Sequence, residues 1–398
     1  MIALRGTSES RWDSDAIIAR VTTRSDRPVA VRGTEALLFM ADVVEGSATQ
    51  GFGAILRRGE HNILSEHSST RPARDEILLP PQLLHLGDGD VIRFEPRTGH
   101  ISVLYRRAST ANTILFTEAC NNYCVMCSQP PVRQPVDCTI EIWRQVIPLV
   151  DKHTAELGIS GGEPTLFPDE LLEMVRLCRN YLPGTALHIL TNGRLFCYLT
   201  YAERLSALRH PDMMLGVPLY SDIDSQHDYI VQAKGAFEQT IKGLLNLGRV
   251  GIKVEIRAVI HKLNVDRLTQ LAAFIARNLP FASHVALMGL EPTGFAKLNI
   301  KELWVDPHDY RATLTQTIQT LAQRRLNASI FNHQLCTVDQ KVWEYARRSI
   351  SDWKLEYLPA CDSCAVKNNC CGFFASSLAV HSNHIKPFDS IAPARATN

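Results

Sequence analysis

The sequence predicts an α/β fold with a parallel sheet at its centre, and two observations support that prediction. Apolar strand candidates alternate with amphipathic helix candidates from about residue 112 to 330, as in sheets built from β/α repeats. The flanking segments differ, because 1–108 contains short β-rich runs and no cysteine, whereas 331–398 contains a cluster of cysteines. Since 398 residues suffice for two or three domains, we predict three, at 1–108, 109–330 and 331–398.

The first of these domains is predicted to be a small β-rich accessory domain. Residues 91–95 and 101–105 are rich in β-branched and aromatic side chains and flank the turn residues Thr98 and Gly99, a pattern typical of a β-hairpin. The polar stretch 65–72 indicates a loop. The β pattern favours a small barrel, and a winged-helix-like module that binds a leader peptide is the alternative.

Six strand candidates define the central domain, namely residues 113–117, 155–159, 185–190, 213–219, 253–260 and 284–288. Helix candidates lie between or after them. One begins at Thr139, a second ends at Gly248, and a last one is expected to begin at Asp306, where an N-cap residue precedes Pro307. The apolar face of the second helix consists of Phe237, Ile241, Leu244 and Leu245.

Composition narrows the class of protein. An apolar content of 45% and a charged content of 21% are ordinary for a folded soluble domain. The net charge of +1 argues against a nucleic-acid partner, and no run of about 20 apolar residues predicts a membrane span. The first residues lack the apolar core of a signal peptide. The 11 cysteines therefore indicate metal or redox use in a reducing compartment, and we expect a cytoplasmic protein.

Three cysteines at the end of the first central strand candidate carry the strongest chemical signal. Cys120, Cys124 and Cys127 have the spacing C-x3-C-x2-C. A fully ligated [4Fe–4S] cluster takes four cysteines, so three thiolates on one loop would leave one iron open to a reacting molecule. The alternatives are a zinc knuckle or a chance group of buried thiols.

Two further motifs follow strand candidates. Gly161-Gly162-Glu163 comes after 155–159, and glycine suits a position where the backbone must approach a ligand closely. Thr191-Asn192-Gly193 comes after 185–190. Because catalytic loops of β/α barrels lie at the carboxyl ends of the strands, Cys120, Glu163 and Asn192 are expected at one edge of the sheet.

In this order, the three motifs resemble the signature of the radical S-adenosylmethionine (SAM) superfamily. The resemblance implies a partial (β/α)6 barrel of the TIM type, which the six strand candidates match. It also implies that Cys120, Cys124 and Cys127 are the catalytic ligands of a [4Fe–4S] cluster whose open iron chelates SAM. Reductive cleavage of SAM in this family gives a 5′-deoxyadenosyl radical that abstracts hydrogen.

The same resemblance suggests the residues that bind the cofactor. Gly161, Gly162 and Glu163 are expected at the SAM amino group, and Met126 near the adenine. Tyr123 and Asn192 are further candidates. Ser221 offers a hydroxyl for the ribose or carboxylate, and Arg257 a charge-assisted bond to the carboxylate, with a structural salt bridge as its alternative role. The candidate substrate groups are Tyr220 and His227, although an exposed loop position without such a role is the simpler interpretation of both residues.

A second group of cysteines lies near the C-terminus. Cys361, Cys364 and Cys370 have the spacing C-x2-C-x5-C, with Cys336 upstream. This resembles the SPASM or twitch type of auxiliary-cluster region, although Phe374 replaces one expected cysteine and the upstream cysteine is single. We infer one auxiliary [4Fe–4S] cluster on these four residues. Cys371 could replace Cys370, and a zinc ribbon is the alternative.

The run from Cys120 to Pro131, together with Cys371-Gly372-Phe373-Phe374, is similar to the His-Xaa-Ser-system radical SAM maturases of bacteria. The resemblance covers most of the chain, with only a loose match in the first 90 residues. It implies a ribosomally made precursor peptide as substrate, modified by oxidative cross-linking. It also implies a second radical SAM maturase as a hetero-oligomeric partner, and an electron donor such as flavodoxin or ferredoxin.

Two other function classes stay open at this point. One is a radical SAM enzyme that acts on a small molecule or activates a glycyl-radical enzyme. The other is a non-catalytic metal-binding partner of a homologous maturase. Intact Cys120, Cys124, Cys127 and Glu163 argue against the second, because an inactive partner has no need of a SAM site.

Overall fold

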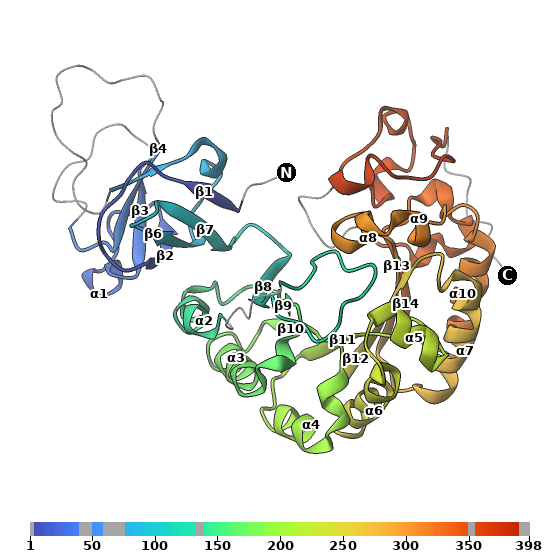
Figure 1. Ribbon diagram of the computed structural model, residues 1–398. Helices are drawn as coiled ribbons and strands as arrows, with labels where there is room; N and C mark the ends of the chain where they lie inside the picture. Colours follow the sequence, from blue (N-terminus) through green and yellow to red (C-terminus); the bar gives the residue numbers. More distant parts are fainter. Residues whose placement is uncertain (1–3, 40–49, 59–75, 133–138, 349–354, 390–398) are drawn as a thin grey trace. The chain divides into compact units, whose positions relative to one another are not determined.

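The structure is a computed structural model that describes residues 4–39, 50–58, 76–132, 139–348 and 355–389 (Figure 1). The chain divides into two compact units. One contains 1–114, 139–157 and 176–185, and the other contains 115–138, 158–175 and 186–398. The loop expected at 65–72 lies outside the described residues. The domain boundaries at 108/109 and 330/331 stay predictions.

A seven-stranded mixed sheet makes up the N-terminal part of the first unit (Figure 1). Its spatial order is β1-β7-β6-β2-β3-β4-β5. Strands β6 and β7 form the predicted antiparallel hairpin, and Gly99 in its turn has φ +70°, which favours glycine. The strands are β1 (Arg5–Thr7), β2 (Ile17–Thr22), β3 (Glu35–Phe39), β4 (Ala54–Arg58), β5 (Glu76–Leu79), β6 (Val91–Glu95) and β7 (His100–Tyr105).

The predicted β-rich character of this region is confirmed, but the expected small barrel is replaced by an open sheet. The order of the described strands runs from β1 to β5 without returning, and β2, β3, β4 and β5 pair in parallel. Alternate side chains of β7 are buried, among them Ile101 and Val103, as expected for a strand with one face on a core. That core includes Leu56, Ile77 and Phe94. A short helix, α1 (Val29–Arg32), connects β2 to β3.

The second sheet also has seven strands, and here the spatial order follows the chain from β8 to β14. Neighbouring strands from β10 through β14 pair in parallel. All six predicted strands are confirmed. The seventh, β14, was missed because four residues are too short to stand out as an apolar run. The strands are β8 (Asn112–Thr117), β9 (Glu156–Gly161), β10 (Ala186–Leu190), β11 (Met213–Pro218), β12 (Lys253–Ile260), β13 (His284–Gly289) and β14 (Ala328–Phe331).

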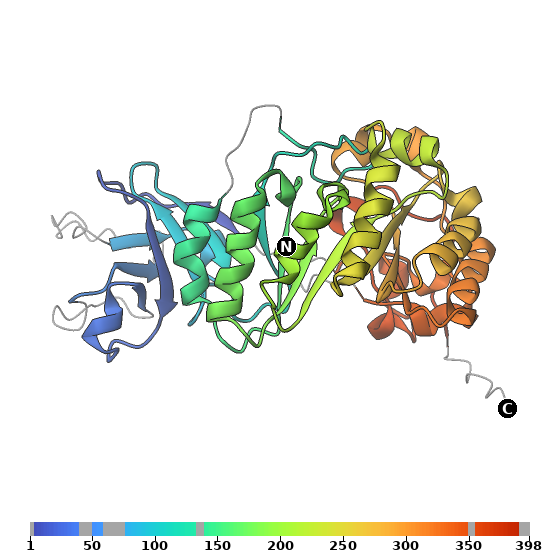
Figure 2. The ribbon, with the colours of Figure 1, turned by 90° about the horizontal axis from the view of Figure 1, so that it is seen from below.

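Helices alternate with these strands, so the predicted α/β class is confirmed, and the curled sheet is a partial barrel (Figures 1 and 2). On its outer side lie α6, α7 and α10. None of the helices in the described residues is long and apolar enough to cross a membrane. The helices are α2 (Ile140–Val146), α3 (Pro168–Tyr181), α4 (Leu199–Ser206), α5 (Asp224–Val231), α6 (Ala236–Arg249), α7 (Leu268–Asn278), α8 (Gly294–Leu298), α9 (Ile300–Leu303) and α10 (Arg311–Gln323).

Two helix predictions need correction. The helix expected at Asp306 begins only at Arg311, because the Asp306 carboxylate accepts the backbone N–H of His308 and closes a turn instead. On α6, Leu245 is 46% exposed, so the predicted apolar face is displaced. The buried residues of that helix are Ala236, Thr240, Gly243, Leu244 and Leu247.

Candidate active site

A cavity of about 310 Å³ lies at the carboxyl ends of the parallel strands in the second unit. The cavity is lined by the loop after β8, the end of β9, the two residues after β10, and residues at or after the ends of β11 to β14. Segments far apart in sequence therefore meet at one edge of the sheet, where β/α barrels place catalytic loops. The predicted residues on this wall are Cys120, Cys124, Met126, Cys127, Gly161, Gly162, Asn192, Tyr220 and Arg257.

The three-cysteine loop is held by backbone hydrogen bonds. The N–H groups of Tyr123 and Val125 donate to the carbonyls of Val231 and Ile230, at 3.0 and 2.9 Å, which ties the loop to the end of α5. The carbonyl of Cys127 accepts from Phe295 at 2.8 Å. Burial raises the pKa of Cys120 to about 11 and that of Cys124 to about 12.

Sulfur spacing separates two kinds of metal site. In the part of the chain that the structure describes, no three cysteine sulfurs lie within 4.8 Å of one another. A single zinc ion binds thiolates at about 2.3 Å, which puts neighbouring sulfurs about 3.8 Å apart in a tetrahedron. The described thiols are therefore not grouped at the spacing that a single zinc ion requires.

The two glycines after β9 allow a close approach to the start of the cysteine loop. A Cβ at Gly161 would overlap the carbonyl oxygen of Thr117, and one at Gly162 would overlap that of Ala119. Gly161 also has φ +146°. The N–H of Gly162 donates to Thr117 at 2.8 Å. Glycine is therefore required here by the chain's own packing, in addition to any ligand.

The Glu163 side chain, which is predicted to bind SAM, lies behind the cavity wall. Its carboxylate is fully buried and is not on the cavity wall. It accepts hydrogen bonds from the N–H and hydroxyl of Thr165, from the Thr191 hydroxyl and from the Asn192 N–H, at 2.5–2.9 Å. Burial nevertheless raises its pKa. Glu163 therefore joins the ends of β9 and β10 and positions Asn192.

Two other cofactor candidates also lie off the wall. The Tyr123 side chain is 47% exposed, and that of Ser221 is fully buried. The Ser221 hydroxyl donates to Gln226 at 2.5 Å and accepts from the Ile223 N–H at 3.0 Å. Neither residue lines this cavity, and a contact of either side chain with SAM stays a prediction.

The wall does contain Asn192, Met126 and Arg257. The Asn192 amide donates to Asn121 at 2.6 Å, and Met126 packs with Tyr220 in a buried cluster. Arg257 is both a wall residue and an ion-pair partner, because its guanidinium donates to Glu255 at 2.5 Å. The alternative role of Arg257 in a structural salt bridge is therefore observed, and its bond to the SAM carboxylate stays a prediction.

The other groups around this wall differ in their access to it. Burial would raise the pKa of Glu255, but bonds from His188 and His284 and the charge of Arg257 hold it below its usual value. His227 lies behind Tyr220, with ring centroids 5.9 Å apart, and burial lowers its pKa to about 4. Tyr220 faces the cavity, whereas His227 does not.

Among the polar wall residues that the sequence interpretation missed are Glu291 and Asn332. Glu291 follows β13, and Asn332 comes directly after β14. The rule that catalytic groups follow strand ends would have identified Glu291. It could not have identified Asn332, because β14 itself was not recognised.

The four predicted auxiliary ligands line one small cavity of about 20 Å³ in the same unit, together with Tyr357 and Phe388. The ligands are Cys336, Cys361, Cys364 and Cys370. Cys371 is not on this wall, and its thiol donates to the Gly372 carbonyl at 3.2 Å. A hydrogen bond from Cys371 lowers the pKa of Cys370 to about 6. Of the two neighbouring cysteines, Cys370 is thus the one that faces the other three.

The two cysteine cavities share wall residues with a third cavity. Leu290 and Asn332 belong to the larger cavity and to a small one between the two. Gln334 and Gly372 belong to that small cavity and to the four-cysteine cavity, and the Gln334 amide donates to the Gly372 carbonyl at 2.8 Å. Shared wall residues therefore link the three-cysteine cavity to the four-cysteine cavity in two steps.

The partial barrel and its strand-end cysteine loop are the features of a known class of protein. Residues 114–275 match the model of the radical SAM superfamily. The central part of this chain is a radical SAM domain, and the members of that superfamily are enzymes.

Individual proteins resemble this chain at low sequence identity. Pyruvate formate-lyase-activating enzyme of Clostridium pasteurianum is 26% identical over 204 residues, which cover 47% of this chain and 80% of the relative. The structure of Streptococcus suis SuiB bound to precursor peptide SuiA has a TM-score of 0.45 and 20% identity, over 58% of this chain and 50% of that chain. A radical SAM methyltransferase from Sphaerobacter thermophilus has a TM-score of 0.43 and 15% identity, over 72% and 77%. This chain thus spans about half the length of SuiB.

Proposed function

We propose that this protein modifies a ribosomally made peptide of the His-Xaa-Ser type by oxidative cross-linking. The observation that carries the proposal is that the cavity with three cysteines and the cavity with four lie in one unit and share wall residues with the same small cavity. An oxidative cross-link needs two functions in one enzyme, removal of a hydrogen atom and removal of an electron. The presence of SuiA in the SuiB structure is consistent with a peptide substrate.

The residues of the larger cavity fit a SAM-binding cluster. Three thiols face it, and no fourth cysteine lies on its wall among the described residues. When bound there, the cluster and SAM supply a 5′-deoxyadenosyl radical, the hydrogen-abstracting chemistry that the protein itself lacks. Arg257 would pair with the SAM carboxylate in a charge-assisted bond. Met126 and Tyr220 supply apolar wall that excludes water.

The second half of the reaction removes one electron and one proton from the substrate. A cluster on Cys336, Cys361, Cys364 and Cys370 would supply an electron acceptor. The proton would go to the carboxylate of Glu291, which lies on the wall of the larger cavity and accepts from the Ser376 hydroxyl at 3.3 Å. The product would then have two hydrogens fewer than the substrate. A second radical SAM maturase and a flavodoxin or ferredoxin as electron donor belong to the same proposal.

The test separates the two cysteine groups. A Cys361→Ala, Cys364→Ala variant should still form 5′-deoxyadenosine from SAM, but the His-Xaa-Ser peptide should not lose the mass of about 2 Da that each new bond removes. Mass spectrometry and chromatography give the two readouts. Cys197→Ala, at a half-buried cysteine outside both cavities, is the matched control and should keep both activities. Full product from a folded double variant would overturn the electron-acceptor role.

Activation of a glycyl-radical enzyme is the second candidate. It is favoured by the 26% identity with pyruvate formate-lyase-activating enzyme, which extends over 80% of that relative. Anaerobic incubation with SAM, reductant and pyruvate formate-lyase distinguishes the two candidates. A glycyl-radical signal in electron paramagnetic resonance would favour activation, whereas cross-linked peptide and no such signal would favour maturation.

A further inference from the structure

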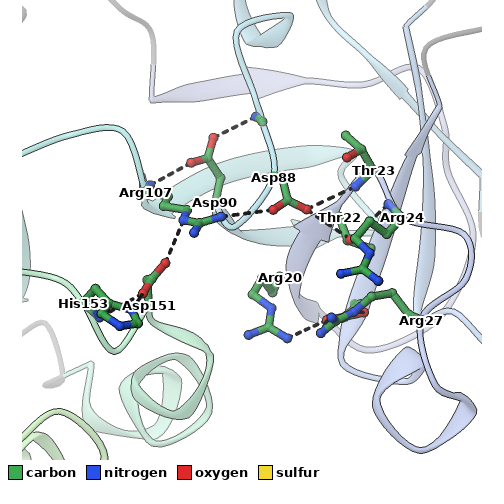
Figure 3. Close-up of polar contacts among 12 residues, drawn as sticks. Arg20, Thr22, Thr23, Arg24, Arg27, Asp88, Asp90, Arg107, Asp151 and His153 are labelled. Carbon is green, nitrogen blue, oxygen red and sulfur yellow. Dashed lines mark hydrogen bonds and ion pairs between the residues drawn. The ribbon is translucent and has the colours of Figure 1, made fainter.

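The first unit contains a polar cavity of about 440 Å³ that no part of the proposed reaction uses (Figure 3). The cavity is lined by residues of β2 and the segment after it, of β3, of the loop before β6, of the segment after β7, and of the segment 148–153. Five basic and three acidic side chains line it, an excess of two positive charges when His153 is neutral. A volume of this size is within the range of pockets that bind small molecules.

The deepest acid of the wall is Glu35, whose side chain is fully buried between two arginines. Arg27 donates to it through Nε and Nη2, at 2.8 and 2.6 Å, and Arg20 through Nη2, at 2.5 Å. Burial would raise the pKa of Glu35, but the two guanidinium groups hold it below its usual value. One carboxylate therefore fixes two cations side by side and balances only one of them.

Stability alone gives a weak reason for this arrangement. A buried ion pair costs desolvation that its Coulomb energy often fails to recover, and apolar residues of the same volume usually stabilise a fold as well or better. Two guanidinium groups that share a carboxylate also repel each other. The arrangement is explained if the pair is held ready for an anion, since rigid support behind the contacting groups is what a binding site needs.

The other acids of the wall are also occupied by the protein's own donors (Figure 3). Arg107 bridges Asp88 and Asp151, at 3.2 and 2.7 Å. Asp88 also accepts from the Thr22 hydroxyl at 3.2 Å, and Asp151 accepts from the backbone N–H of His153 at 2.9 Å. The carboxylates on this wall are thus paired with donors of the protein, and the net charge of the wall is positive.

In contrast, some guanidinium nitrogens on this wall donate no hydrogen bond to any of the described residues. Within the described residues, the hydrogen bonds of Arg20 use Nη2 alone, and those of Arg27 use Nε and Nη2. Arg24 donates to Asp26 through Nε and Nη2, so its Nη1 is the guanidinium nitrogen that makes no hydrogen bond within the described residues. Lys152 adds an ammonium group to the same wall. Guanidinium forks of this kind match the geometry of phosphate and carboxylate oxygens.

We propose that this cavity binds one small multivalent oxyanion, a molecule with phosphate or carboxylate groups. Arg20 and Arg27 form the floor of the site through Glu35, and Arg24 and Lys152 contribute at its rim. The recognised chemistry is the same for both kinds of group, so inorganic pyrophosphate and citrate serve as the two probes. Preference for one of them identifies the source.

Isothermal titration of the full chain tests the proposal. We expect saturable binding of one pyrophosphate or one citrate per chain. Arg24→Gln and Lys152→Gln, which leave Glu35 untouched, should each weaken it, and Arg20→Gln should weaken it by about 10-fold or more. Arg57→Gln is the matched control, because Arg57 pairs with Glu76 in the same sheet and is not on the wall, so binding should be unchanged.

The same titration contains the outcomes that would overturn the site. Absence of saturable binding for both probes would do so, as would equal weakening by Arg57→Gln. Retained affinity in Arg24→Gln and Lys152→Gln, together with a folded Arg20→Gln that still binds fully, would place any anion elsewhere. The Cys120→Ala, Cys124→Ala, Cys127→Ala variant must keep the binding, because its loss there would mean that the probe binds iron.

Discussion

At the scale of single residues, the Glu163 carboxylate is held by the protein's own donors. Four donors surround this carboxylate, and they come from the end of β9 and from the two residues after β10. The side chain is thus a positioning residue behind the cavity wall. What it positions is Asn192, whose amide lies on that wall.

This role predicts the effect of Glu163→Gln. The substitution keeps the volume but places an amide N–H₂ against protein donors, so we expect a loss of about 1–3 kcal/mol in the free energy of unfolding. SAM affinity should fall in parallel, through displacement of Asn192. Chemical denaturation and SAM titration measure the two effects.

The control is Glu203→Gln, at an exposed position on α4, which should change stability by less than about 0.5 kcal/mol. A direct contact between Glu163 and SAM would give the opposite pattern, a large loss of affinity in a protein of unchanged stability.

At the scale of elements, the end of β9 is packed against the segment that leads from β8 into the cysteine loop. Gly162 and Glu163 donate their backbone N–H groups to Thr117 and Ala119, both at 2.8 Å. This contact determines where the cysteine loop begins. The glycines are as much a part of the cluster site as the thiols, although they bear no ligand atom.

We therefore expect Gly162→Ala to be harmful out of proportion to one methyl group. The new Cβ would overlap the backbone of Ala119, so overpacking should cost about 1–3 kcal/mol of stability and lower iron retention at the first cluster. Iron analysis and thermal unfolding measure both. Gly184→Ala is the matched control, because its Cβ would meet nothing within 4 Å. Equal behaviour of the two variants would show that the packing at β9 is unimportant.

At the scale of the whole molecule, the two cysteine groups lie in one unit and the oxyanion cavity in the other. The chemistry proposed for the second unit needs two metal sites of different ligand number. Three thiols leave a position open for a reactant, whereas four thiols complete a cluster that only transfers electrons.

The corresponding prediction is an iron content. The reconstituted protein should hold about eight irons and eight sulfides per chain, and the Cys120→Ala, Cys124→Ala, Cys127→Ala variant about four. Anaerobic iron, sulfide and zinc analysis gives the numbers. Stoichiometric zinc, or about four irons in the unaltered protein, would eliminate the auxiliary cluster.

Much of this architecture could be predicted from the sequence, because strands and helices of a β/α repeat differ in apolar period. The six central strands and the N-terminal hairpin follow from local patterns that the fold does not override. Strand β14 could not be seen, since four residues carry too little pattern. The helix start at Asp306 failed because the same capping signal also closes a simple turn.

The sites were predictable only in part. Cysteine spacing singled out the seven thiols that the two cavities bring together. Spacing could not show that the acid of the Gly-Gly-Glu motif turns inward, because that depends on donors from the next strand. The arginines around Glu35 gave no signal at all, since single arginines in a polar sequence are usually solvated. Only the sheet pairing of β2 with β3 brings them to one carboxylate.

The open arc of the second sheet has a consequence for long substrates. Its first and last strands, β8 and β14, are at opposite ends of the strand order and are not neighbours within the described residues. A polypeptide could therefore enter from the side, while the 310 Å³ cavity admits only a side chain or two at a time. The modified residue would then be selected by the length of polypeptide between it and the part of the substrate that the protein binds.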